Sequence, residues 1–195
     1  MVKFIDKNRK DDACKDEILM RCDCGNEILS IGVVNGIMED KTVIPVLRFK
    51  FYQCGSGPCK SVKDIDKAAM VHFGEPEAIN TIYSLLKGEI NGGHGYVESQ
   101  EGYYIGFDLA DTDDTLTTIH FAFTEKDIHK IYKYLYKGKP EKADNIVAWS
   151  VGFGRPELEK LITFIAKIVG KLNLPKEETE KTVDGEIEVK PSSDK

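Results

Sequence analysis

The chain has 195 residues, of which 41% are hydrophobic and 31% are charged, and its formal net charge is -6. This composition is typical of a globular protein and too apolar for a chain that is disordered throughout. No apolar run approaches the roughly 20 residues that span a bilayer, and the polar N-terminus lacks a signal-peptide core, so we expect a cytoplasmic protein. An acidic chain repels phosphates, which disfavours nucleic-acid binding unless a local patch is basic.

Residues 1–16 are charged, and we expect them to be loosely attached. Strand patterns follow at 18–22, 28–34, 42–53 and 68–73, and again at 103–109, 116–123 and 146–153. In the third of these strands, apolar residues alternate with polar or amphipathic ones, which predicts one buried face and one solvated face. The alternating sets are Leu47, Phe49 and Phe51 on one face and Arg48, Lys50 and Tyr52 on the other.

Three segments carry four apolar residues at i, i+3, i+4 and i+7, the spacing of one helical face, and each is followed by glycine. They predict amphipathic helices at 75–87, 125–137 and 156–169. Each helix follows a strand, so the chain reads as three strand-then-helix units. The first two units also share a strand histidine, His72 and His120, which suggests a duplicated module. The alternative is that any strand followed by an amphipathic helix has this pattern.

These elements predict an α+β fold, in which a curved, mainly antiparallel sheet carries three amphipathic helices packed on one side. The domain should cover 17–172, with two possible sub-units at 17–90 and 95–172. A glycine-rich stretch at 91–95 is expected to connect them flexibly. The polar segment 173–195 has no helical face and is expected to be a disordered tail.

The five cysteines are an odd number, which disfavours a disulfide framework and favours metal ligands or buried thiols. Four of them form two close pairs about thirty residues apart: Cys22 with Cys24, and Cys54 with Cys59. Zinc is often held by four thiolates donated by two turns, so these four residues are a candidate structural zinc site. The pairs have one and four intervening residues instead of the usual two. Ordinary buried cysteines at strand ends are therefore the alternative.

No complete catalytic constellation is evident, and we expect a protein that is not an enzyme. The loop 54–61 ends in Lys-Ser like a phosphate-binding loop, but cysteines stand where that loop needs glycines. No serine occupies a nucleophile elbow, and no cysteine has an obvious histidine partner. An enzyme would require His72 or His120 to meet a carboxylate in a cleft.

The predicted solvated face of the third strand is the best nucleic-acid candidate in the sequence. Arg48, Lys50 and Tyr52 would offer cations to phosphates and a ring to bases, as in proteins that bind single strands. Sheet-plus-helix units of this kind resemble the whirly-type single-strand binders. This resemblance concerns architecture only.

The opening 19–29, with its Cys22-Asp23-Cys24-Gly25 turn, resembles small uncharacterised proteins encoded by phages and mobile elements of low-GC Gram-positive bacteria. The resemblance implies no known activity, but it implies a phage accessory protein directed at the host. We therefore expect a non-enzymatic binding protein that acts through protein–protein contacts, as a modulator or inhibitor of a host factor. The alternative is a single-stranded nucleic-acid-binding protein.

Overall fold

The computed structural model describes residues 17–21, 25, 27–38, 40–52, 69–112 and 115–172. Within these ranges the chain forms two four-stranded antiparallel sheets and four α-helices, so the predicted α+β class is confirmed. The predictions for 1–16 and 173–195 lie outside the described residues. None of the helices in the described part is both long and apolar enough to cross a membrane.

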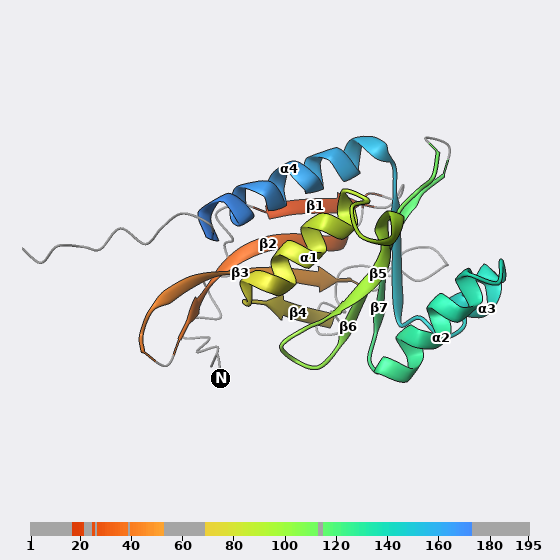
Figure 1. Cartoon of the computed structure of the whole chain (residues 1–195), viewed down its shortest axis with the longest axis horizontal. Helices are drawn as coiled ribbons and strands as arrows, with labels where there is room; N and C mark the ends of the chain where they lie inside the picture. Colours follow the sequence, from red (N-terminus) through yellow and green to blue (C-terminus); the bar gives the residue numbers. More distant parts are fainter. Residues whose placement is uncertain are drawn as a thin grey trace, which may run out of the picture.

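Each half of the chain contributes one four-stranded sheet followed by a helix (Figure 1). The first sheet has the order β1-β2-β3-β4 and is followed by α1 (Pro76–Leu86). Its strands are β1 (Glu17–Arg21), β2 (Glu27–Ile37), β3 (Val43–Phe51) and β4 (Ala69–Phe73). The second sheet has the order β5-β6-β7-β8 and is followed by α4 (Arg155–Leu172). Its strands are β5 (His94–Glu98), β6 (Tyr104–Asp108), β7 (Thr117–Ala122) and β8 (Trp149–Phe153).

The two halves share a sequence pattern where the fourth strand meets its helix. Residues 71–77 and 151–157 both read Val-x-Phe-Gly-x-Pro-Glu. Phe73 and Phe153 occupy the same place in the two sheets. Phe73 pairs with Leu47 of β3, and Phe153 pairs with Thr117 of β7. Proline suits the first helical turn, and glutamate there complements the helix dipole. The repeated unit is therefore four strands and a helix.

This arrangement corrects the division into three strand-then-helix units. The middle helix, α2 (Glu125–Leu135), and the short α3 (Pro140–Asp144) lie in the connection between β7 and β8. His72 lies on the fourth strand of the first half, whereas His120 lies on the third strand of the second half. The two histidines are therefore not equivalent positions of a repeat.

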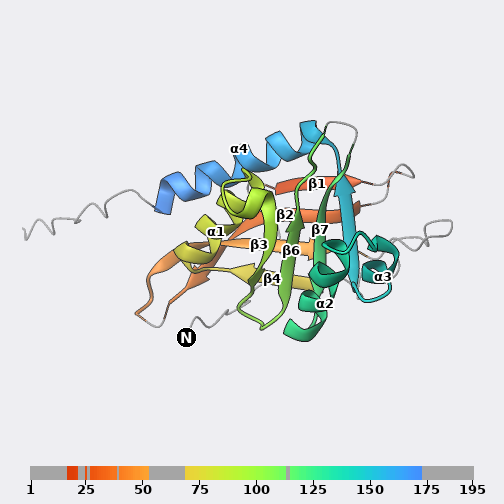
Figure 2. The same ribbon diagram turned by 45° about the vertical axis from the view of Figure 1, so that its right-hand side comes forward.

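The inner faces of the two sheets meet with their strands crossing (Figure 2). Aromatic side chains of the two sheets pack against each other. The ring centroids of Phe49 and Phe107 are 6.4 Å apart, and those of Phe51 and Phe121 are 5.5 Å apart. Helices α1 and α4 contact each other, and their buried side chains complete the same core. Burial of this apolar surface is the main source of stability in such a domain.

The helices do not all pack on one side of a sheet as predicted. α1 and α4 bury side chains in the core that the two inner faces share, but α2 and α3 cover the outer face of the second sheet. There Ile128, Ile131 and Tyr132 of α2 bury a second, smaller apolar cluster with Ala122 and Ala143. The apolar stripe of α2 predicts that the helix covers a sheet, but not which face it covers.

The glycine-rich stretch 91–95, predicted to be a flexible connection, is regular structure instead. Asn91–Gly93 form a 3₁₀ turn, and β5 begins at His94. A Cβ atom on Gly93 would lie 2.4 Å from Leu109, and one on Gly95 would lie 2.8 Å from Leu85. These glycines therefore permit close packing of α1 and β6 against the turn.

Candidate binding surfaces

The alternation predicted for β3 is confirmed. Leu47, Phe49 and Phe51 are fully buried on the inner face of the first sheet. Lys50 is half-buried on the opposite face, with its Nζ atom 5.1 Å from the centre of the Tyr52 ring. The expectation that Arg48 is solvent-exposed is wrong, because its side chain is only 4% exposed.

Arg48 is buried because it lies in a row of paired residues across the sheet. Glu17, Gly32, Arg48 and His72 occupy successive strands at one level. The Nη2 atom of Arg48 lies 3.4 Å from Oε1 of Glu17, and that carboxylate also accepts from the Ser30 hydroxyl. A guanidinium bound to a carboxylate is less available to a phosphate.

The electrostatic surroundings of Tyr52 are also acidic. Burial raises the pKa of the Tyr52 hydroxyl, and the nearby carboxylates of Glu27 and Glu17 raise it further. Negative potential at this end of the sheet opposes the approach of a polyanion. The structure thus brings Arg48, Lys50 and Tyr52 to one face, but it places Glu17 beside Arg48 and the carboxylates of Glu27 and Glu17 near Tyr52.

His72 does meet a carboxylate. Its Nδ1 lies 2.6 Å from Oε1 of Glu101, and its backbone N–H donates to Oε2 of Glu101 at 3.0 Å. The neighbouring Gln100 backbone N–H donates to the His72 carbonyl at 3.0 Å. The β5–β6 turn therefore continues the hydrogen bonding of the edge strand β4, which gives the pair a structural role.

His120 lies on β7 and is 4% exposed. Its Nδ1 is 3.3 Å from the Ser150 hydroxyl, while its Nε2 is buried with no hydrogen-bond partner among the described residues. Burial lowers the pKa of His120, against the opposing effect of Asp108 and Asp144. Asp108 is bonded to His94 instead, with 2.5 Å between Oδ1 and Nδ1. Ser150, His120 and Asp108 therefore do not form a catalytic triad.

The α2 helix is held on the second sheet by a buried hydroxyl. The Tyr132 hydroxyl donates towards the carbonyl oxygens of Phe107, at 2.6 Å, and Gly95. Gly106 lies directly beneath, where a Cβ atom would be 2.9 Å from that oxygen. Burial raises the pKa of Tyr132 far above its ordinary value, so it acts as a hydrogen-bond donor at any physiological pH.

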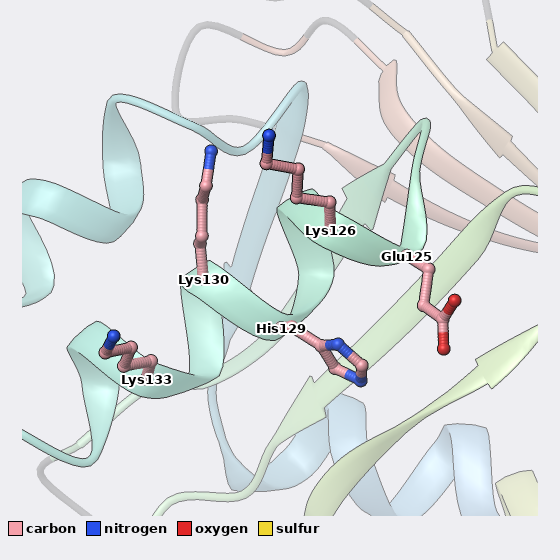
Figure 3. A pocket seen from close by; sticks show the side chains of 5 residues that line it. All are labelled: Glu125, Lys126, His129, Lys130 and Lys133. Carbon is pink, nitrogen blue, oxygen red and sulfur yellow. The ribbon is translucent and has the colours of Figure 1, made fainter.

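The solvent face of α2 is basic. Lys126, Lys130 and Lys133 follow one another along the side of the helix opposite Ile128 and Ile131 (Figure 3). Together with Glu125 and His129 they border a shallow, open hollow. Sequence reasoning overlooked this face, although lysines at i, i+4 and i+7 are visible in the sequence as the complement of the apolar stripe.

The β2–β3 hairpin extends beyond the first sheet as a two-stranded arm (Figure 1). β1 pairs with β2 only as far as Gly32, and β4 pairs with β3 only as far as Leu47. Beyond these points β2 and β3 stay paired with each other, up to Ile37 and Val43. Among the described strands, residues 34–37 and 43–46 therefore pair only with each other. Three apolar side chains at the tip are exposed: Ile37, Met38 and Val43.

The candidate zinc ligands Cys22, Cys24, Cys54 and Cys59 lie outside the described residues, as does Cys14. Within the described ranges, no group of three or more His, Cys, Asp or Glu side chains is placed to hold a metal ion.

Comparison with protein-family models, with curated proteins and with solved structures finds no match to this chain. The functional argument therefore rests on the surfaces described above.

Proposed function

We propose that this chain is a non-enzymatic binding protein that acts through protein–protein contacts, and that the tip of the β2–β3 arm makes the principal contact. The observation that carries the proposal is the exposure of Ile37, Met38 and Val43 at the end of a projecting hairpin, with Val43 59% exposed. Neighbouring exposed apolar side chains on a projecting element are typical of an interaction site.

The arm also has strand edges that a partner can use. An unpaired edge offers N–H and C=O groups to an added strand. Pro45 lacks an N–H group and is paired with Asn35, so it weakens the β3 edge as a template. Among the described strands, residues 34–37 of β2 pair only with β3, so their other edge offers its outward-pointing N–H and C=O groups. We infer that a partner contacts the apolar tip and the β2 side of the arm.

The resemblance of residues 19–29 to phage and mobile-element proteins suggests the kind of partner. We propose a host protein whose activity the chain modulates or inhibits. An extended apolar hairpin suits this role, because it can enter a groove on a larger protein without rearrangement of the two-sheet core.

The proposal is tested by affinity capture from host lysate with paired variants. The arm variant carries Ile37→Ser and Val43→Ser, and the control carries Leu116→Ser, which removes another exposed apolar side chain far along the chain. We expect a specific host protein to bind the wild type and the control but not the arm variant. Equal capture by all three proteins, with unchanged melting temperatures, would exclude the arm as the contact.

We also propose that Cys22, Cys24, Cys54 and Cys59 bind one structural zinc ion. Described residues beside both pairs support this, because the Arg21 guanidinium donates to the Gly25 carbonyl at 3.0 Å and the Tyr52 N–H donates to Ile28 O at 3.0 Å. The end of β1, the start of β2 and the end of β3 therefore lie together. Two strand spacings amount to about 10 Å, a gap that two short turns can close around a metal.

Metal analysis of protein purified without a histidine tag should give about one zinc per chain. Cys24→Ser or Cys54→Ser should abolish the zinc content, and Cys14→Ser should leave it unchanged. Zinc-free wild-type protein with an unchanged melting temperature in chelator would refute the site.

A further inference from the structure

We propose that the solvent face of α2 binds single-stranded nucleic acid through the phosphate backbone. The site consists of Lys126, Lys130 and Lys133, which we call the lysine stripe (Figure 3). This binding goes beyond the protein contacts assigned to the arm, and it uses a different surface from β3.

The first argument is local charge. From Glu125 to Asp144, the segment that forms α2 and α3, six lysines and four acidic residues give a net charge of +2 in a chain whose net charge is -6. The segment that covers the outer face of the second sheet is therefore opposite in sign to the molecule as a whole. A basic patch of this kind overrides the repulsion that the rest of the surface exerts on a polyanion.

The second argument is spacing. Residues on a helix advance by about 1.5 Å each, so Lys126 and Lys130 are separated by about 6 Å along the axis and Lys130 and Lys133 by about 4.5 Å. Phosphates along one strand of a duplex rise by about 3.4 Å each. The two lysine separations therefore lie between one and two phosphate steps. Successive phosphates can thus meet successive ammonium groups, and at Lys130 the phosphate would replace Asp127, whose Oδ1 lies 4.0 Å from the Lys130 Nζ.

The third argument is rigidity. α2 is fixed by Tyr132, whose buried hydroxyl bonds to the carbonyls of Gly95 and Phe107, and by the Thr124 cap, which accepts from the Asp127 N–H. The lysine stripe lies on the side of the helix away from these anchors. Its cations are therefore displayed in a fixed register without a loop that must first be ordered.

The fourth argument distinguishes nucleic acid from an acidic protein. Lysine is depleted in protein interfaces, whereas as a compact point charge it binds phosphate well. Tyr136, which follows α2, is 69% exposed, and the Lys142 ammonium lies 6.0 Å from the centre of the Tyr134 ring. An exposed ring beside cations, such as that of Tyr136, allows an unpaired base to stack, which favours a single strand over a duplex.

The test measures binding of a fluorescein-labelled oligothymidylate to the full chain by fluorescence anisotropy, at several salt concentrations. The stripe variant carries Lys126→Gln, Lys130→Gln and Lys133→Gln. The control carries Lys160→Gln, Lys167→Gln and Lys171→Gln, which removes three exposed lysines from α4 and so changes the net charge equally. A third variant, Tyr136→Ala, tests stacking.

For the wild type we expect log K to fall with log salt with a slope of about -2, as three phosphate contacts predict. The stripe variant should bind at least about tenfold more weakly at low salt with a flattened slope, and the control should match the wild type. Tyr136→Ala should weaken binding about fivefold or more at every salt concentration.

Three results would overturn the proposal. One is the absence of oligonucleotide binding by the wild type at low salt. Another is an equal loss of affinity in the stripe variant and the control, which would mean that overall charge alone decides binding. The last is stripe-dependent binding of polyglutamate that is tighter than binding of the oligonucleotide, which would assign the stripe to an acidic protein instead. None of these results bears on capture by the arm, so the two proposals fail independently.

Discussion

The carboxylate of Glu101 binds two nitrogen atoms of His72, the ring Nδ1 at 2.6 Å and the backbone N at 3.0 Å. With the Gln100 N–H bound to the His72 carbonyl, this contact caps the edge of β4 with the turn between β5 and β6. An open strand edge invites pairing with other chains. The contact thus links the two halves of the molecule and protects the first sheet at the same place.

Replacing Glu101 with Ala should lower the free energy of unfolding by about 0.5–1.5 kcal/mol, because the backbone N–H of His72 loses its acceptor. Glu159→Gln is the control, since its exposed pair with Arg155 should contribute at most about 1 kcal/mol. Chemical denaturation of both variants measures the difference. Equal stabilities would mean that the cap contributes nothing.

The effect of Glu101 should also depend on pH. Burial favours the protonated form, but hydrogen bonds from the His72 ring and backbone outweigh it and hold the pKa of Glu101 below 4.5. A carboxyl with a lowered pKa in the folded state stabilises the fold above its unfolded pKa and loses that effect as pH falls through the folded value. The stability difference between wild type and Glu101→Gln should therefore shrink below about pH 4.5.

His120 should make the fold sensitive to mild acid. Burial lowers the pKa of His120 from 6.5, so the unfolded chain binds more protons than the folded chain between the folded pKa and 6.5. Stability should consequently be fully present above pH 6.5 and decrease as pH falls below it. Melting temperatures between pH 5 and 7.5 should show a shallower decline for His120→Gln than for the wild type, and equal declines would contradict the prediction.

Two glycine substitutions, one under α2 and one on α4, should have opposite effects on stability. Gly106→Ala places a Cβ atom 2.9 Å from the Tyr132 hydroxyl and 3.0 Å from Ile128, and should destabilise by about 1–3 kcal/mol. Gly170→Ala meets nothing within 4 Å in α4 and should stabilise by up to about 1 kcal/mol. Thermal melts compare the two. A neutral Gly106→Ala would mean that α2 is not seated on β6.

Arg48 and Lys50 should respond differently to truncation. Arg48→Ala removes a buried side chain that pairs with Glu17, and should destabilise by about 2 kcal/mol or more. Lys50→Ala should change stability by at most about 0.5 kcal/mol, because the side chain is half-buried and its cation lies over Tyr52 at the margin. If Arg48→Ala leaves the denaturation midpoint unchanged, the pair with Glu17 is not formed in solution.

Local patterns in the sequence predicted most of the secondary elements, although not β5 or α3. The alternation of Phe49 and Phe51 with Lys50 identified β3, and apolar spacing predicted helices at 75–87, 125–137 and 156–169 where the structure has Pro76–Leu86, Glu125–Leu135 and Arg155–Leu172. Periodicity, proline and glycine act over a few residues, and neighbours in sequence are enough to decide them.

Tertiary structure decided what each face contacts. Arg48 has the pattern of an exposed residue, but Glu17, 31 residues earlier, pairs with it across the first sheet. The amphipathic pattern of α2 does not specify which sheet face it covers, and only the folded chain places it on the outer side of the second sheet. Such contacts join residues far apart in sequence, and their free energy depends on shape and burial that no local pattern records.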